Sequence, residues 1–565
     1  MTRSLLRSMP VMKAASPRAA LRFPFPAPFL VAYSPLHTLN ADQEVAQADH
    51  SQMRLFAVER NTALNPVDLL KGRWQPCTSE TVKTAGPWYG FSAVGYFFGR
   101  DLQGSINVPV GLIQDCWGGT LAEAWTSADG LKAIGPDFVP QLEATAQVSK
   151  SVDDGTYNQQ KIMEDWNTQA GAVPDAAEPT FDATTWKTMH GLPHRWSAQD
   201  DPDLANNFVG AVKFRKEIDL SPESLDKGGE LDLGILNDED ITWINGTKVG
   251  GERGWIPRKY QVLAGLLKPG RNVIEIWLLN TPGSGGMMGR PEDLSLKIDG
   301  ESAVPLVGDW QYKVLMPLEK MPPRLYAIVG HNDWPASIYN GMIAPLLPFG
   351  IKGAIWYQGE QNADRAAQYK RLLPAMISDW RQRWNEGDFP FLIVQLAGFN
   401  DNSQWPWLRD AQAYTANHVS KAGLVTAVDI GDPTDIHPKN KQEVGRRLAL
   451  LAEAQVYHQD VPYSGPVYKS VRIDGSAVHI SFDHSGGLNA KGGPDLKGFT
   501  LAGADRVYYA AEGKIDADEV LLTSPQVPQP VAVRYDWAGG PNGNLYNQVD
   551  LPAFPFRSDD WPQDQ

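Results

Sequence analysis

The chain has 565 residues, of which 42% are hydrophobic and 21% charged, and its formal net charge is −15. Single hydrophobic cores stop growing near about 250 to 300 residues, so we expect two or three domains. The sequence has no run of about 18 apolar residues that could span a bilayer as a helix. The acidic balance argues against a nucleic-acid partner, because phosphate binding needs a basic face and Lys and Arg do not cluster here.

Aromatic residues are numerous, with 19 Trp and 18 Tyr, which suits a protein that handles neutral, hydroxyl-rich ligands such as sugars. Most large aromatic side chains nevertheless fill cores. The two cysteines, Cys77 and Cys116, allow at most one disulfide and match no metal-ligand spacing. The sequence also lacks His-Glu-x-x-His and clustered His ligands. We therefore predict neither a metal nor a cofactor.

The first 33 residues carry five basic side chains and no acidic one, and prolines at 24, 26 and 28 interrupt their apolar stretch. A secretory signal peptide needs a continuous apolar segment of about 7 to 15 residues. This segment does not predict a signal peptide, and residues 1–39 form a separate Arg- and Pro-rich stretch.

Short apolar runs then alternate with helical patterns. Residues 53–58 and 108–115 are typical of buried strands, and residues 92–102 are typical of a helix. A further helical segment is expected over about 141–166. This alternation predicts an α/β domain with a parallel sheet.

The pattern changes near residue 180. Between residues 186 and 299, short alternating strands are separated by Gly, Pro, Asn and Asp turns, which predicts a β-sandwich inserted into the α/β domain. The α/β pattern returns with a strand end at 354–357, the buried-type run PFLIVQLA, and a helix with one apolar face: Leu372, Leu373, Met376, Ile377, Trp380 and Trp384. The predicted boundaries are 40–180 and 303–465 for the split α/β domain, 181–302 for the insert and 466–565 for a small C-terminal β region.

The stretch GAIWYQGEQN at 353–362 places polar side chains directly after a predicted strand, at the sheet edge where α/β folds build their sites. The Gln358 amide is a candidate donor to a developing oxyanion. The alternative is a buried amide that binds loop backbone.

Two further stretches carry candidate chemistry. CWGGT at 116–120 has two glycines that let backbone N–H groups approach a ligand, although Gly-Gly after a strand also makes a simple tight turn. In DIGDPTDIHPKNK at 429–441, His437 lies among Asp432 and Asp435. A carboxylate that orients an imidazole is what a general base needs, whereas a solitary loop histidine is usually surface.

Together these stretches resemble the sialate O-acetylesterase family of the SGNH hydrolase superfamily, whose members remove acetyl esters from sialic acids or hemicellulose sugars. The similarity extends from about Asn40 over four long runs: VPVGLIQDCWGGTLAEAWTS, NGMIAPLLPFGIKGAIWYQGEQN, DIGDPTDIHPKNKQEVGRRLA and RYDWAGGPNGNLYN. The resemblance implies a three-layer α/β/α fold with a Ser, a His and an acidic residue in the site, and a periplasmic or extracellular location.

The resemblance also assigns residues one by one. His437 matches the catalytic histidine, and Asp435, or alternatively Asp432, matches its acidic partner. The usual partner stands three residues before the histidine, where this chain has Thr434. Gly119 (or the preceding glycine) and Gln358 match oxyanion-hole positions. Two more residues, Glu360 and Asn362, lie in the same site loop.

The family's nucleophile motif, Gly-Gln-Ser-Asn-Met, is missing. It precedes the region matched by NADQEVAQADHSQMRLF, where this chain has FPAPFLVAYSPLHTLN, and Gly-Gln-Ser-Asn occurs nowhere in the 565 residues. Either the N-terminal segment was lost through a shifted reading frame or wrong start, or the chain is a catalytically inactive relative. Ser34 lies close to the position of the missing motif but lacks the residues that surround its serine. QGSIN at 103–107 has similar residues in another order and at another position in the chain. Ser92 is better explained as a helix N-cap.

The insert resembles the galactose-binding-like jelly roll of bacterial glycoside hydrolases. Three runs carry this resemblance: FVGAVKFRKEIDL, NDEDITWINGTKVGG and PRKYQVLAGLLKPGRNVIEI. Trp243, Trp255 and Arg258 are candidate sugar contacts there, with packing as the alternative.

We expect a serine esterase that acts on an acetylated carbohydrate, or else a non-catalytic carbohydrate-binding protein. The sequence indicates no oligomeric state.

Overall fold

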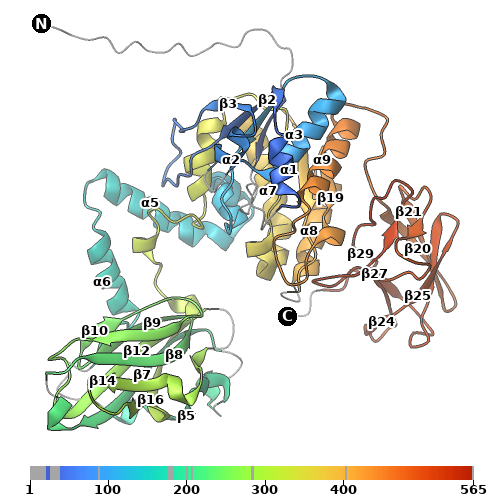
Figure 1. The fold of residues 1–565 in the computed structure, drawn as a ribbon. Coiled ribbons are helices and arrows are strands. Elements are labelled where there is room, and N and C mark those ends of the chain that lie inside the picture. Colours follow the sequence, from blue (N-terminus) through green and yellow to red (C-terminus); the bar gives the residue numbers. More distant parts are fainter. Residues whose placement is uncertain are drawn as a thin grey trace, which may run out of the picture. The chain divides into compact units, whose positions relative to one another are not determined.

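The computed structural model divides into two compact units, one made of Met1–Lys150 with Ile328–Gln565 and the other of Ser151–Ala327 (Figure 1). The residues described are 21–25, 38–86, 90–175, 183–198, 201–204, 208–224, 226–281, 285–400 and 404–562.

Two sheets with parallel strands form the centre of the first unit. One has the order β1-β4-β2-β3, in which β4 pairs in parallel with β1 and β2 while β3 is antiparallel to β2. The other has the order β17-β18-β19 and is entirely parallel. The strands are β1 (Leu21–Phe25), β2 (His50–Ala57), β3 (Trp74–Cys77), β4 (Val110–Gln114), β17 (Ala354–Trp356), β18 (Phe391–Gln395) and β19 (Ala422–Thr426). The predicted α/β domain is confirmed.

The apolar run predicted as a buried strand is β18. All five of its residues are buried, because it has a parallel neighbour on each side and helices packed against it. The predicted helix with one apolar face is α7 (Ala366–Trp384), and all six residues assigned to that face are buried. Both predictions are confirmed.

The other helices of this unit are α1 (Ala41–Ala46), α2 (Thr81–Thr84), α3 (Ala93–Ile106), α4 (Ala128–Ala133), α8 (Trp405–His418) and α9 (Lys441–Gln455). α3 packs against α9, and α7 packs against α8. Indole rings fill part of the core between the elements: Trp356 meets Trp125 and Trp380 edge to face, at 6.3 and 6.0 Å between ring centroids. Much of the aromatic content therefore serves packing.

The helical segment expected over about 141–166 is two helices, α5 (Val139–Asp153) and α6 (Gln159–Gln169). Gly155 adopts φ +66° between them, and the side chain of Asn158 caps α6 by accepting a hydrogen bond from Lys161 N at 3.0 Å. A left-handed glycine and a new cap end one helix and begin the next.

The second unit is a sandwich of antiparallel strands, with sheet orders β10-β9-β12-β7-β16-β5 and β15-β14-β8-β13-β6 and with β11 paired to β8. Its strands are β5 (Lys187–Leu192), β6 (His194–Arg195), β7 (Gly210–Leu220), β8 (Gly229–Asn237), β9 (Glu239–Ile244), β10 (Thr247–Gly250), β11 (Pro257–Val262), β12 (Gly270–Asn280), β13 (Gly286–Met288), β14 (Leu294–Ile298), β15 (Val304–Pro305) and β16 (Gly308–Pro317). Apolar residues of both sheets share one core. The expected boundaries, 181 and 302, fall inside this unit.

The three candidate sugar contacts of the insert differ in burial. Trp243 is buried in a cluster with Trp166 and Trp277. Arg258 is fully buried and donates to Asp240 Oδ1 at 2.7 Å and to several backbone carbonyls, so it holds the sandwich together. Trp255 is 58% exposed and is the one of the three that a ligand can reach.

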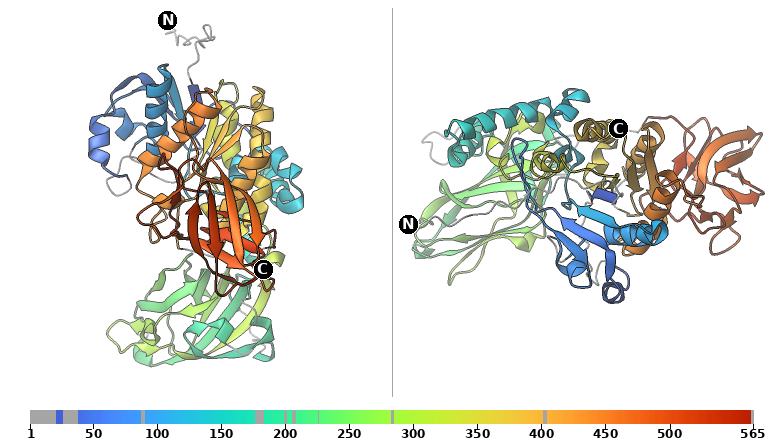
Figure 2. Two further views of the ribbon diagram at one scale, coloured as in Figure 1. Left: turned by 90° about the vertical axis from the view of Figure 1, so that its right-hand side faces the viewer. Right: turned by 90° about the horizontal axis from the view of Figure 1, so that it is seen from above.

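The C-terminal region, coloured orange to red in Figure 2, belongs to the first unit. Its buried apolar residues form a small core of their own. Its sheets have the orders β20-β21-β26-β25, β24-β23-β27-β29 and β22-β28. The strands are β20 (Val467–Asp474), β21 (Ala477–Asp483), β22 (Asn489–Ala490), β23 (Phe499–Ala502), β24 (Tyr508–Ala510), β25 (Glu512–Asp516), β26 (Glu519–Thr523), β27 (Ala532–Tyr535), β28 (Leu545–Tyr546) and β29 (Phe556–Arg557).

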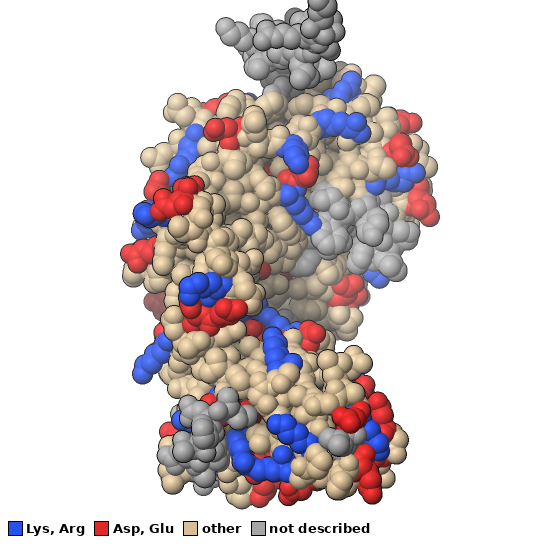
Figure 3. Space-filling model, turned by 90° about the vertical axis from the view of Figure 1, so that its left-hand side faces the viewer, with Lys and Arg blue, Asp and Glu red and all other residues tan. Residues whose placement is uncertain are grey.

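On the face drawn in Figure 3, basic and acidic side chains are interspersed. No helix in the described ranges is long and apolar enough to cross a membrane. Cys77 and Cys116 are both free and buried, and burial raises their thiol pKa values to about 12 and about 11.

Candidate active site

The loop after β19 carries the candidate base. His437 Nδ1 lies 3.1 Å from Asp435 Oδ1, and the same oxygen accepts the His437 backbone N–H at 2.9 Å. Asp432 instead accepts from the backbone N and the hydroxyl of Thr434, at 2.9 and 2.8 Å. Of the two acidic candidates, Asp435 is therefore the one in contact with the imidazole.

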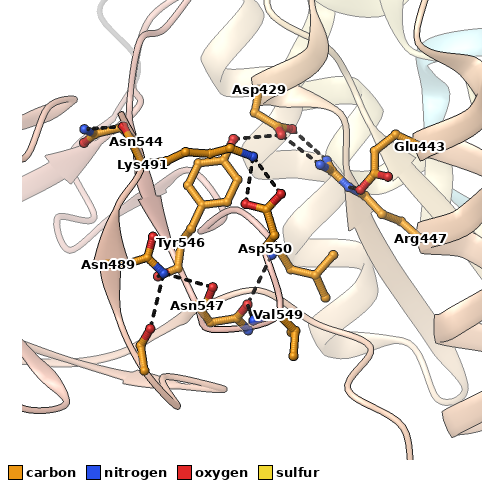
Figure 4. A network of polar contacts seen from close by, with 12 residues as sticks. Asp429, Glu443, Arg447, Asn489, Lys491, Asn544, Tyr546, Asn547, Val549 and Asp550 are labelled. Atoms are coloured by element: carbon orange, nitrogen blue, oxygen red, sulfur yellow. Dashed lines mark hydrogen bonds and ion pairs between the residues drawn. The ribbon is translucent and has the colours of Figure 1, made fainter. Parts of the chain in front are cut away.

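A buried ion pair anchors the start of this loop (Figure 4). Asp429 accepts two hydrogen bonds from the Arg447 guanidinium of α9, at 2.6 and 2.8 Å, and Arg447 also contacts Glu443 at 2.9 Å. Tyr546 of β28 donates its hydroxyl to Asp429 at 2.9 Å. Burial and the Asp429 carboxylate raise the pKa of Tyr546 above its usual range, so this hydroxyl stays a donor. The C-terminal region thus helps fix the loop that carries the histidine.

The second candidate loop follows β17. Gln358 is 1% exposed, and its amide nitrogen donates to Thr120 O at 3.1 Å and to Asn362 Oδ1 at 2.7 Å. Asn362 Oδ1 also accepts from Ala122 N at 3.0 Å, and Asn362 Nδ2 donates to Glu123 at 2.9 Å. These contacts join the loops after β4 and β17, so the stretches CWGGT and QGEQN are neighbours. In this structure both amide hydrogens of Gln358 are donated to protein acceptors.

Two glycines are required by the geometry of these loops. Gly119 has φ +71°, a left-handed conformation that favours glycine, in a turn where Thr120 Oγ1 donates to Trp117 O at 2.7 Å. A Cβ on Gly359 would lie 2.4 Å from Leu408 Cδ2 of α8, so this glycine allows the loop to pack closely on that helix.

A buried carboxyl and a buried lysine lie near each other in this region. Oε2 of Glu360 is buried and has no hydrogen-bond partner in the described part of the chain, and burial raises the pKa of Glu360 to about 7. Lys441 is 4% exposed; burial lowers its pKa to about 8, and the carboxylates of Glu360 and Asp435 oppose that shift. The lysine therefore lies between the two candidate loops.

Sequence reasoning missed Lys441, and it also missed Asp115. Asp115 directly follows β4 and is fully buried; neither of its carboxylate oxygens has a hydrogen-bond partner within the described ranges. Burial raises the pKa of this carboxyl well above its usual value. The sequence signal was an acidic residue that follows the apolar run 110–113 and Gln114.

Of the serines considered as substitute nucleophiles, Ser92 lies next to the end of β4, because its backbone N–H donates to Gln114 Oε1 at 2.7 Å. Ser92 Oγ accepts from Gly95 N at 3.2 Å at the start of α3, which confirms the predicted N-cap. QGSIN forms the end of α3. Ser34 lies outside the described residues. No group of three or more His, Cys, Asp or Glu side chains that could hold a metal ion occurs in the described part of the chain.

His437 is paired with Asp435 in the loop that follows the parallel strand β19, and a carboxylate that orients an imidazole is what a general base needs. Residues 332–453 match the family described as carbohydrate esterase, sialic acid-specific acetylesterase. The matched segment contains Gln358, Asp435 and His437.

The chain is also similar to individual sialate O-acetylesterases and to a carbohydrate acetylesterase of known structure. The sialate O-acetylesterase of Mus musculus is 33% identical over 170 residues, which are 26% of this chain and 31% of the relative. The Homo sapiens sialate O-acetylesterase is 30% identical over 158 residues, or 24% of this chain and 30% of the relative. The match thus spans less than a third of these curated relatives. The crystal structure of a carbohydrate acetylesterase from Xanthomonas citri superposes with a TM-score of 0.58 and 25% identity, over 96% of this chain and 81% of that chain.

Proposed function

We propose that this chain has the site of a carbohydrate O-acetylesterase, a serine-type hydrolase that cleaves acetyl esters on sugars. The observation that carries the proposal is the 3.1 Å contact between His437 and Asp435 inside the matched family segment. We further propose that the parallel strands and their helices form a three-layer SGNH-type domain, that the insert is a galactose-binding-like jelly roll, and that the protein acts in the periplasm or outside the cell.

In the proposed reaction, a serine hydroxyl attacks the carbonyl carbon of the acetyl group while His437 takes its proton. Asp435 orients the imidazole and stabilises its charged form. The backbone N–H at Gly119 and the Gln358 amide stabilise the oxyanion, the latter by exchanging one of its internal hydrogen bonds. His437 then gives the proton to the departing sugar oxygen, and water cleaves the acetyl-enzyme by the same route in reverse.

The nucleophile is the missing part. Because Gly-Gln-Ser-Asn is absent from the sequence, we expect the chain as it stands to lack the serine that this mechanism needs. The alternative function is a non-catalytic carbohydrate-binding protein with the same fold.

A graft separates the two functions. Residues 1–37 are replaced by the N-terminal strand and Gly-Gln-Ser-Asn-Met segment of an active sialate O-acetylesterase. The unaltered chain and the chimera are then compared with 4-nitrophenyl acetate and with a serine-reactive fluorophosphonate. We expect neither turnover nor labelling of the unaltered chain, and both in the chimera.

The control is His437→Ala in the chimera, which should lower turnover at least about 100-fold, the usual contribution of a general base. A chimera that unfolds at the same temperature as the unaltered chain but remains inactive would favour the binding protein. Turnover by the unaltered chain would show that one of its own residues acts as the nucleophile.

A further inference from the structure

A cleft of about 440 Å³ lies beside α8 and the C-terminal β region, at the opposite end of β19 from His437. Its lining includes Ala422 and Leu424 at the start of β19, whereas the histidine loop follows the end of that strand at Thr426. Five strand residues span about 16 Å. The cleft is therefore a separate feature, and its volume falls in the range of small-ligand pockets.

One wall of the cleft is a single face of α8. Asp410, Ala413, Tyr414, Asn417 and His418 all line it, at spacings of three and four residues that place them on one side of a helix. Tyr414, Asn417 and His418 are exposed, although the opposite face of the same helix is buried in the core. The polar and aromatic side chains on this face of α8 are therefore not needed to pack the core.

Aromatic rings line both walls. On α8 the rings of Tyr414 and His418 stack at 4.0 Å with an interplanar angle of 21°. On the C-terminal side Tyr463 meets His484 edge to face at 5.0 Å, and Tyr468 stacks on Phe556 at 4.5 Å. Rings held in fixed orientations offer rigid apolar surfaces with polar edges, which match the apolar faces and equatorial hydroxyls of pyranose rings.

The charges in the cleft compensate one another. Asp410 contacts Lys370 at 2.9 Å and Arg557 at 3.7 Å, and Asp483 contacts Lys469 at 2.8 Å. Of the side chains that line the cleft, Lys370 and Arg557 are basic and Asp410 and Asp483 are acidic, so the formal charges of the lining sum to zero. A charged ligand would have to compete with these pairs, whereas an uncharged one would not.

We propose that this cleft is a carbohydrate-binding site for a neutral oligosaccharide, distinct from the candidate esterase site. The aromatic pairs Tyr414–His418 and Tyr463–His484 bind the ring faces, and Asp410, Lys370 and Arg557 bind hydroxyls. Such a site would hold a glycan chain on the protein whether or not the esterase site turns over. The proposal does not depend on the proposed esterase function.

Isothermal titration calorimetry with xylohexaose and cellohexaose, both unacetylated, tests the site in the full chain. We expect at least one of them to bind with a dissociation constant of about 1 mM or tighter, and 3′-sialyllactose to bind at least about tenfold more weakly. Tyr414→Ala and Tyr463→Ala should each weaken binding about tenfold.

Tyr509→Ala is the matched control, because Tyr509 and Tyr414 are each 37% exposed and only Tyr414 lines the cleft. Neither Tyr509→Ala nor His437→Ala should change the affinity. Thermal midpoints within about 2 °C of the unaltered chain establish that the variants fold. The proposal would be overturned if neither neutral hexasaccharide bound, or if Tyr414→Ala and Tyr463→Ala bound as tightly as the unaltered chain. Stronger binding of sialyllactose, or loss of binding in His437→Ala, would also overturn it.

Discussion

Asp435 and Asp432 both lie within five residues of His437, yet only Asp435 contacts its ring. In the active chimera, Asp435→Asn is expected to lower kcat at least about 100-fold, because the imidazole loses the group that orients it and stabilises its charge. Asp432→Asn is the matched control, with a loss below about tenfold. Stopped assays of kcat at fixed pH measure both. An equal loss in the two variants would mean that loop geometry, and not the contact with Asp435, supports the histidine.

Glu360 gives a pH dependence to the free energy of unfolding. Its pKa is about 7 in the folded protein and about 4.5 in the unfolded chain, so the folded state binds more protons between these values. Stability is therefore lost as the pH rises from about 4.5 to 7. Glu360→Gln should remove this loss and raise the free energy of unfolding at pH 7.5 by about 3 kcal/mol, with little change at pH 4.5.

Chemical denaturation at the two pH values measures this effect. Glu512→Gln is the control, because Glu512 is exposed. If Glu360→Gln did not raise the free energy of unfolding at pH 7.5, or raised it equally at both pH values, burial of the ionised carboxylate would not destabilise the folded state.

At the residue scale, the sequence was informative where a motif had a known order. The neighbours of His437, Gln358 and Gly119 along the chain predicted roles for them, and these roles stay predictions. Lys441 and Asp115 could not be singled out in this way, because a charged residue looks the same in sequence whether it is exposed or buried. Their burial depends on packing between segments several hundred residues apart.

At the scale of elements, Arg409 of α8 joins the C-terminal region to the parallel sheet. It is 1% exposed and donates to the carbonyls of Leu396, Ala397, Ala538 and Gly539 at 2.7 to 2.9 Å. Arg409→Met should lower the free energy of unfolding by about 3 kcal/mol, because the buried carbonyls lose their donor. Arg472→Met, at a side chain that is 61% exposed, should change it by less than about 0.5 kcal/mol. Equal losses measured by denaturant titration would contradict this role.

Elements with strong local signals were predicted well. β18 is a continuous apolar run and α7 has a regular apolar face, so each was recognisable without knowledge of its neighbours. The break between α5 and α6 was missed, since Gly155 and Asn158 are individually compatible with a helix. The pairing of β16 with β5 and β7 joins segments about a hundred residues apart, which no local pattern in the sequence indicates.

At the scale of the whole molecule, the unit Ser151–Ala327 has its own core and is expected to fold alone. Expressed by itself, it should unfold cooperatively in a calorimeter. A fragment of residues 181–302 is the matched comparison, because it lacks β16 and leaves β5 without its partner strand. The shorter fragment should show no cooperative transition. Equal transitions in both would mean that β16 contributes nothing to the sandwich.

The central claim is that the described loops form the base and oxyanion turn of a carbohydrate O-acetylesterase. The most direct measurement is release of acetate from acetylated xylan fragments and from 9-O-acetylated sialic acid by the grafted chimera and its His437→Ala variant. We predict that acetate is released from one of these sugars and that the variant loses at least about 99% of the rate. A folded chimera that releases no acetate, or releases it equally without His437, would contradict the claim.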